Sequence, residues 1–185
     1  MFIQTSHYDS IAAMIPTYTP EGDITTVIAT NGHQQKVKGR VRTVLNRLAR
    51  SYSTDLVALK EKVTLATERS LLQPLPLAPG LVLFPLKLRL PRVSGDQTTG
   101  YINFHSVIDV VENHIPPYHS TIRLIGGTEI PVLWTTHTVK QHLQQARLAI
   151  SYTAYDPEIP PDLSIHIYHA IKGLCRLASF RHSPH

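Results

Sequence analysis

Two turn sequences, Asn31-Gly32 and Gly126-Gly127, constrain the fold of this 185-residue chain more than any other local feature. Each lies between two strand-like stretches that are rich in β-branched or alternating apolar residues. A two-residue turn needs backbone conformations with positive φ, which Asn and Gly adopt at little cost, and it joins adjacent antiparallel strands. The sequence therefore predicts two β-hairpins, which pair residues 24–30 with 33–38 and residues 120–125 with 128–134.

The middle of the chain adds further strand-like segments to these hairpins. Residues 80–84 are an unbroken apolar run between Gly and Pro, which is typical of a buried strand. Residues 86–90 alternate apolar and basic side chains, residues 101–111 alternate with one slip, and both are predicted to be strands. A weaker alternation predicts a strand at 62–67, and the proline-rich segment 71–79 is expected to be an extended loop.

Three stretches show the periodicity of helices. From residue 40 to 59 apolar residues recur every three or four positions, which predicts an early basic helix that the cluster at 51–54 can break into two. Thr138 and Gln141 form a capping box that starts a second helix, and Asp162 can cap a final one. The predicted fold class is α+β, with antiparallel β-hairpins forming one or two sheets, an early basic helix and two C-terminal helices.

The charged residues are distributed very unevenly along the chain. Residues 1–23 carry a net charge of −3, and residues 96–185 carry −1. Residues 24–95 hold twelve cations and three carboxylates, a net charge of +9. Such a concentration favours a polyanionic partner, either nucleic acid or anionic lipid, and the alternative is a solvated basic face that keeps the protein in solution.

Nine cations of this basic segment are the candidate contacts to such a partner. The run from Lys36 to Arg42 places a cation at every second position, so in an extended chain all of them would project to one side at a spacing of ~6.6 Å. This spacing is similar to that of the phosphates along one DNA strand, and phosphate contacts position a protein without reading sequence. The candidates are Lys36, Lys38, Arg40, Arg42, Arg47, Arg50, Lys87, Arg89 and Arg92.

No motif in the sequence supports catalysis. The nucleophile elbow, the phosphate-binding loop, the dinucleotide fingerprint and the zinc-protease motif are absent. The eleven histidines and the single cysteine, Cys175, lack the paired spacing that a zinc site needs. We therefore expect a protein that is not an enzyme, with no catalytic residue, no metal site and no cofactor.

The sequence also favours a cytoplasmic location. A lone thiol fits a reducing compartment, because it cannot form an intramolecular disulfide. No basic run precedes an apolar core at the N-terminus, as a secretory signal would require. The longest apolar stretch, 71–90, is interrupted by prolines and cations, so no membrane partner is expected.

Several collinear segments resemble the ComK-type competence transcription factors of Gram-positive bacteria. Residues 80–85, Gly-Leu-Val-Leu-Phe-Pro, are similar to the family's Phe-Leu-Phe-Pro block, and residues 100–103 to its Gly-Trp-Ile strand. Residues 120–133 resemble its β-hairpin, and residues 40–54 resemble its basic segment that contains Ser-Ser-Tyr. The likeness is one of order and pattern along the chain rather than of a single diagnostic motif.

This resemblance implies a DNA-binding transcriptional activator of the genes for DNA uptake and natural transformation. Such an activator binds A/T-rich boxes in double-stranded promoter DNA as a homodimer or higher oligomer, close to the nucleoid, and RNA polymerase would be a further partner. The implied division of the chain is an acidic N-terminal segment at 1–23, a DNA-binding region at 24–155, and a C-terminal helix and tail at 156–185. Thr99-Gly100-Tyr101 stands where the family has Cys-Gly-Trp.

A second function remains open from the residues alone. The chain could be a protein-interaction or regulatory module that makes no direct contact with DNA. Such a module would dock its partner through a hairpin edge or through the amphipathic last helix.

Overall fold

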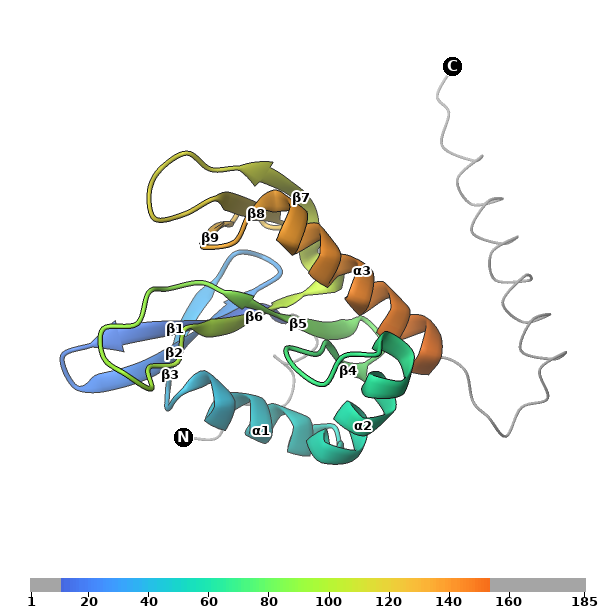
Figure 1. Ribbon diagram of the computed structural model, residues 1–185. Helices are drawn as coiled ribbons and strands as arrows, with labels where there is room; N and C mark the ends of the chain where they lie inside the picture. Colours follow the sequence, from blue (N-terminus) through green and yellow to red (C-terminus); the bar gives the residue numbers. More distant parts are fainter. Residues whose placement is uncertain (1–10, 154–185) are drawn as a thin grey trace, which may run out of the picture.

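Antiparallel sheets dominate the computed structural model, which describes residues 11–153 (Figure 1). One sheet has six strands in the order β3-β2-β1-β6-β5-β4, and the other has three in the order β7-β8-β9. The larger sheet consists of β1 (Ile11–Thr19), β2 (Gly22–Ala29), β3 (Gln34–Lys38), β4 (Leu75–Ala78), β5 (Leu81–Lys87) and β6 (Thr99–Asn103). The remaining elements are β7 (Val107–Glu112), β8 (Ser120–Leu124), β9 (Glu129–Val132), the helices α1 (Val41–Ser51), α2 (Leu56–Thr67) and α3 (Thr136–Thr153), and the 3₁₀ turn η2 (Phe104–Ser106). This architecture confirms the predicted α+β fold class.

The larger sheet lies between two layers, and each of its faces buries a separate apolar core. The helix α1 covers one face, where Leu45 and Leu48 pack with Met14 of β1. The smaller sheet and α3 cover the other face, where Phe84 of β5 packs with Ile122 of β8. Figure 1 shows α1 and the smaller sheet on opposite sides of the larger sheet. Burying each of these side chains contributes roughly 1.5–3 kcal/mol of transfer free energy, so both faces stabilise the sheet.

Pro16 and Pro85 lie inside strands of the larger sheet, at positions where one neighbouring strand is missing. Pro16 of β1 lies beyond Met14, the last residue of β1 that pairs with β6. Pro85 of β5 lies beyond Leu83, where the pairing with β4 ends. Each proline therefore has a paired strand on one side only, and this is the environment in which a strand tolerates the loss of an N–H donor.

Both predicted hairpins are present, and their turns contact each other. Gly32, Gly126 and Gly127 all have positive φ. A Cβ atom at Gly126 would lie 2.4 Å from the carbonyl oxygen of Thr30, and one at Gly32 would lie 2.8 Å from the carbonyl oxygen of Gly126. Glycine is therefore needed at Gly32 and Gly126 for two reasons. The turn conformation has a positive φ, and the close approach of the two turns leaves no space for a Cβ atom.

The early helix is broken, as the sequence allowed, but the strand predicted at 62–67 is wrong because these residues continue α2. Asp55 caps α2, because its carboxylate accepts hydrogen bonds from the backbone N–H groups of Val57 at 2.7 Å and Ala58 at 3.3 Å. The hydroxyls of Thr64 and Thr67 donate to the backbone carbonyls four residues earlier, at 2.9 and 2.8 Å. These hydrogen bonds allow residues 62–67, whose alternation predicted a strand, to be part of a helix.

Two further strand predictions need correction. The segments 80–84 and 86–90 are mainly one strand, β5, which ends at Lys87, and β4 lies within the segment 71–79 that was expected to be a loop. The predicted strand 101–111 is divided between β6 and β7, which belong to different sheets. The buried Asn103 marks this division, because its side-chain oxygen accepts a hydrogen bond from the N–H of His105 at 3.2 Å and so starts η2.

The expected boundary between residues 23 and 24 is wrong, because a hairpin crosses it. β1 lies inside the larger sheet and pairs with β2 from Ile11 to Thr19, so residues 11–23 belong to the folded region. The helix and tail expected at 156–185 lie outside the described residues. Within residues 11–153, no helix combines the length and the apolar character that crossing a membrane would need.

Candidate nucleic-acid interface

The fold brings most of the candidate cations to one end of the larger sheet. At this end β3 and β5 finish, α1 begins, and the β1–β2 turn and the β5–β6 loop lie close together (Figure 1). The antiparallel register produces this convergence, since Lys38 is opposite Ile24, and Tyr18 is opposite Asp23. We call the resulting surface the basic end, and it comprises Lys36, Lys38, Arg40, Arg42, Arg47, Lys87, Arg89 and Arg92.

The predicted extended row of alternating cations is not present. β3 ends at Lys38, Gly39 has a φ of +115°, and Arg40 lies at the N-cap of α1. Glycine is the residue that adopts this backbone conformation without strain, so the chain changes direction here. Val37 is buried against α1. The alternation of a strand therefore places the exposed Lys36 and Lys38 on the other face, away from the helix that carries Arg42.

The arginines of α1 divide between two sides of the helix. Arg47 reaches back to β3, where its Nη1 donates to the carbonyl oxygen of Lys38 at 3.5 Å. The backbone N–H of Arg42 donates to Gln97 of the β5–β6 loop at 3.5 Å. Arg50 is near the C-terminal end of α1, about 12 Å along the helix from Arg42. It therefore lies outside the basic end.

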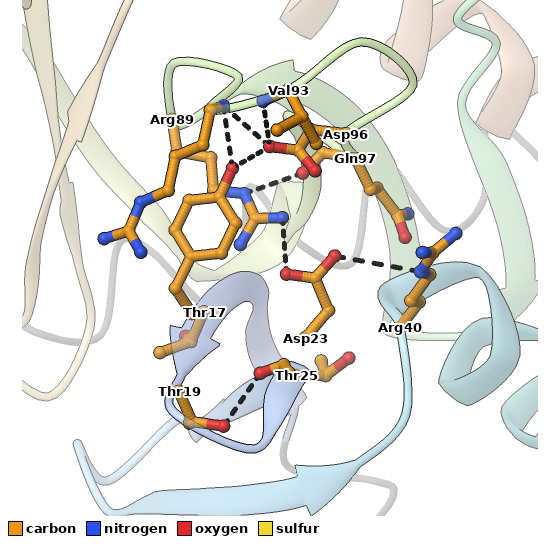
Figure 2. Close-up of polar contacts among 12 residues, drawn as sticks. Thr17, Thr19, Asp23, Thr25, Arg40, Arg89, Val93, Asp96 and Gln97 are labelled. Atoms are coloured by element: carbon orange, nitrogen blue, oxygen red, sulfur yellow. Dashed lines mark hydrogen bonds and ion pairs between the residues drawn. The ribbon is translucent and has the colours of Figure 1, made fainter.

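Arg89 is a buried structural residue, and this corrects its place among the candidate contacts. Its side chain is 11% exposed, and its Nη2 forms an ion pair with the Asp23 carboxylate at 2.9 Å. Its Nε donates to the carbonyl oxygen of Gln97 at 2.8 Å. Asp23 also lies 3.7 Å from Arg40, whose side chain is 67% exposed. The carboxylate therefore forms a close ion pair with Arg89 and a longer one with the exposed Arg40 (Figure 2).

Tyr18 is held between two guanidinium groups. The Cζ atoms of Arg89 and Arg92 lie 3.6 and 4.0 Å from the centre of its ring. Two guanidinium groups this close to one ring centre would overlap if they shared a face, so they must stack on opposite faces. Such stacking is favourable because the ring faces carry negative quadrupole charge.

The hydroxyl of Tyr18 is hydrogen-bonded to the carboxylate of Asp96, which also organises the β5–β6 loop. Asp96 accepts hydrogen bonds from the backbone N–H groups of Arg92 at 2.6 Å and Val93 at 3.1 Å. These donors, the Tyr18 hydroxyl first among them, lower the pKa of Asp96 to about 2. Burial raises the pKa of Tyr18, and the hydrogen bond to Asp96 raises it further. The pair therefore keeps a carboxylate and a neutral phenol over the ordinary pH range.

Seven of the nine candidate cations form none of the ion pairs found within residues 11–153. The four ion pairs in that part of the chain involve Arg40, Arg89, Arg123 and His114. The cations that remain available to a polyanion are Lys36, Lys38, Arg42, Arg47, Arg50, Lys87 and Arg92.

A cavity of about 500 Å³ opens beside the β5–β6 loop. Lys87 and Arg92 line it together with the apolar side chains of Leu90 and Leu133. The N–H of Leu133, the residue after β9, donates to the carbonyl oxygen of Lys87 at 3.0 Å, so the cavity lies beside this junction with Lys87 and Arg92 at its wall. Within the described residues, no group of three histidine, cysteine or acidic side chains is placed to hold a metal ion.

The residues that organise the basic end were not predicted from the sequence, and they are Tyr18, Asp23, Asp96 and Gln97. One local signal was available, because Pro20-Glu21-Gly22 is a turn-forming sequence between two β-rich stretches. It indicates a hairpin that would place Tyr18 and Asp23 opposite each other, as they are in the structure.

No family model, curated protein or solved structure matches the chain. The likeness to competence factors therefore rests on the pattern of residues alone.

Proposed function

We propose that this protein is a DNA-binding transcriptional activator of competence genes, and that the basic end is its contact surface for A/T-rich promoter duplexes. One observation carries the proposal. Cations that are far apart in the sequence, on β3, α1 and the β5–β6 loop, converge on one end of the sheet, and most of them have no carboxylate partner within the described residues.

Counterion release would make the binding of DNA to these cations favourable and dependent on salt. Each phosphate that a lysine or arginine neutralises releases condensed cations from the duplex, which is a favourable entropy change. Lys36 and Lys38 lie on the edge strand β3, and Arg47 of α1 donates a hydrogen bond to the backbone of the same strand, so cations lie on both sides of this edge. Edge strands of this kind can lie along a groove and follow a phosphate backbone.

The two edges of the larger sheet argue against the alternative function, a module that docks a partner by adding a strand. β3 and β4 are the two edges of the larger sheet. β3 carries Lys36 and Lys38, and β4 contains Pro76 and is flanked by Pro74 and Pro79. Lysine and proline are the residues with which sheets prevent the addition of another strand. We therefore favour contact with DNA over strand addition.

The cellular setting follows from the resemblance to competence factors. The activator would act in the cytoplasm at the nucleoid, bind as a homodimer or higher oligomer, and contact RNA polymerase at the promoter. Sedimentation of the protein bound to a duplex that carries two A/T-rich boxes tests the oligomer, and a single protomer per duplex contradicts it.

Salt dependence of binding tests the contact surface. The logarithm of the association constant for an A/T-rich duplex, measured by fluorescence anisotropy, should fall with the logarithm of salt concentration by about 0.9 per phosphate contact. The double variant Lys36→Ala, Lys38→Ala should bind more weakly and should have a slope smaller by about 1.8.

A matched control removes the same charge elsewhere. Lys60 and Lys62 are exposed on α2, away from the basic end. Their double alanine variant should retain the slope of the unmodified protein, apart from a small general effect of net charge. A flat salt response of the unmodified protein, or equal slopes for the two double variants, would contradict the proposal.

A further inference from the structure

The β5–β6 loop, residues 88–98, has an apolar tip that is exposed and yet firmly held. Leu90 is 55% exposed and Val93 is 67% exposed, and Pro91 and Arg92 between them are exposed as well. These four residues, 90–93, are the tip of the loop. Loops without regular structure are ordinarily the mobile part of a fold, and their exposed positions are ordinarily polar.

The contacts at the base of this loop restrain it. Leu88 is buried, and its N–H donates to the carbonyl oxygen of Thr98 at 2.9 Å. Arg89 ties the loop to β2 through Asp23. Asp96 holds the backbone of Arg92 and Val93 and is itself bonded to Tyr18 of β1 (Figure 2). The tip is therefore held by side chains from β1, β2 and the loop itself.

Core packing does not explain this anchoring of the apolar side chains, because Leu90 and Val93 stay largely exposed while Arg92 stacks on Tyr18. Ordering a loop costs roughly 1–2 kcal/mol of conformational entropy per residue, and holding apolar side chains in water gains nothing in return. The balance differs for a surface that binds a partner, because its apolar side chains leave water on binding. If the ordering cost is met in the free protein, it does not reduce the affinity for a partner.

The surroundings of the tip indicate the chemistry of that partner. Lys87 and Arg92 flank the apolar side chains, and neither has a carboxylate partner among the described residues. Gln97 of the same loop contacts the first turn of α1, so the tip belongs to the basic end. An apolar point between cations matches the minor groove of a duplex, where leucine and proline side chains wedge between base steps while basic residues meet the adjacent phosphates.

We propose that the tip of the β5–β6 loop is a wedge that enters the minor groove and bends the bound duplex. Leu90 and Val93 contact the base steps, and Arg92 and Lys87 contact the phosphates on either side. This inference rests on the proposed function, because it assigns a role within the same DNA contact surface.

The test compares two double variants on a duplex labelled at both ends for resonance energy transfer. The unmodified protein should bring the ends of an A/T-rich duplex closer together. Leu90→Ser with Val93→Ser should bind roughly tenfold more weakly and leave the duplex unbent, because the apolar contacts are lost. Its salt slope should be unchanged, since no cation has been removed.

The control is Val57→Ser with Leu65→Ser, which removes apolar side chains of similar exposure, 68% and 72%, from α2. It should bend the duplex like the unmodified protein. If the loop variant also bends it fully with the original affinity, the wedge is contradicted while the DNA contact stands. If the unmodified protein shows no salt-dependent binding, both the wedge and the proposed function fall. Thermal unfolding of each variant confirms that the fold is retained, and Leu90→Ser alone repeats the test with a smaller change.

Discussion

The two ends of the larger sheet are held together by different kinds of contact. At one end the β2–β3 turn meets the β8–β9 turn, and the backbones approach so closely that Gly32 and Gly126 leave no space for a side chain. At the other end, Asp23, Arg89, Tyr18 and Asp96 hold the β5–β6 loop through charge and hydrogen bonds. One end depends on shape and the other on electrostatics, so substitutions, salt and pH should affect them differently.

The two ends also differ in the charge that they offer to a partner. The end that depends on shape joins its two turns by backbone contact, and the turn residues 30–32 and 125–127 carry no charge. The charged end places one carboxylate, Asp23, between two arginines and leaves its other cations without an ion pair among the described residues. Positive charge therefore remains at the end that we assign to DNA.

The largest expected effect of a single methyl group is at the glycine end. Gly126→Ala should lower the free energy of unfolding by about 3 kcal/mol, because the added Cβ lies 2.4 Å from the Thr30 carbonyl oxygen and φ is +82°. Denaturant unfolding measures this change. Gly127→Ala is the matched control, since its φ is +77° but no atom lies within 4 Å of the added Cβ. It should cost only about 1 kcal/mol, and equal losses for the two variants would show that the contact between turns contributes nothing.

A somewhat smaller effect is expected at the charged end. Arg89→Ala should lower the free energy of unfolding by about 2 kcal/mol, because it leaves the largely buried Asp23 carboxylate with only the distant Arg40. Hydrogen exchange of the backbone N–H groups of Arg92 and Val93 should also accelerate, since the base of their loop is released.

Arg40→Ala is the control for this prediction. Its pair with Asp23 is longer, at 3.7 Å, and its side chain is 67% exposed. Exposed pairs of this kind contribute about 0–1 kcal/mol, so the variant should unfold almost like the original protein. A loss as large as that of Arg89→Ala would mean that Asp23 depends on both arginines equally.

The sequence predicted the parts of the fold that depend on local chemistry. Glycine at positive φ identified both hairpins, and Asp55, a good capping residue, agrees with the predicted break between α1 and α2. β1 was missed because its neighbours are chosen by long-range pairing, and because Pro16 argues locally against a strand. Only the end of the pairing with β6 makes this proline acceptable, and no local pattern shows where that pairing ends.

The candidate site was predictable in composition but only partly in geometry. The net charge of residues 24–95 is visible in the sequence, whereas its collection at one end of the sheet follows from the antiparallel register. Arg89 illustrates the limit. It continues the alternation of Lys87 and was therefore predicted to be an exposed contact, but β5 ends at Lys87 and the next residues turn inward to Asp23. Local alternation does not indicate where a strand stops.

The smallest expected effect concerns the response of the charged end to pH. The pKa of Asp96 is about 2 in the folded protein, below its ordinary value of 3.8. Its carboxylate therefore stabilises the fold above pH 3.8, and this contribution declines as the pH falls toward about 2. Tyr18→Phe removes the largest cause of the shift, so the pKa of Asp96 should rise and less stability should be lost in acid. Melting temperatures measured between about pH 2 and 5 test this difference.

The same variant makes a second prediction, for alkaline pH. Burial and the bond to Asp96 raise the pKa of Tyr18 above its ordinary value of 10, so the neutral phenol stabilises the fold below pH 10 and this contribution is lost as the pH rises further. Phenylalanine cannot ionise, so Tyr18→Phe should lose less stability there too. Tyr118 makes no contact with Asp96, so Tyr118→Phe should leave the loss of stability unchanged in both acid and alkali. If Tyr18→Phe behaves like Tyr118→Phe at both extremes, the bond between Tyr18 and Asp96 does not hold the loop, and Arg89 with Asp23 would be its main anchor.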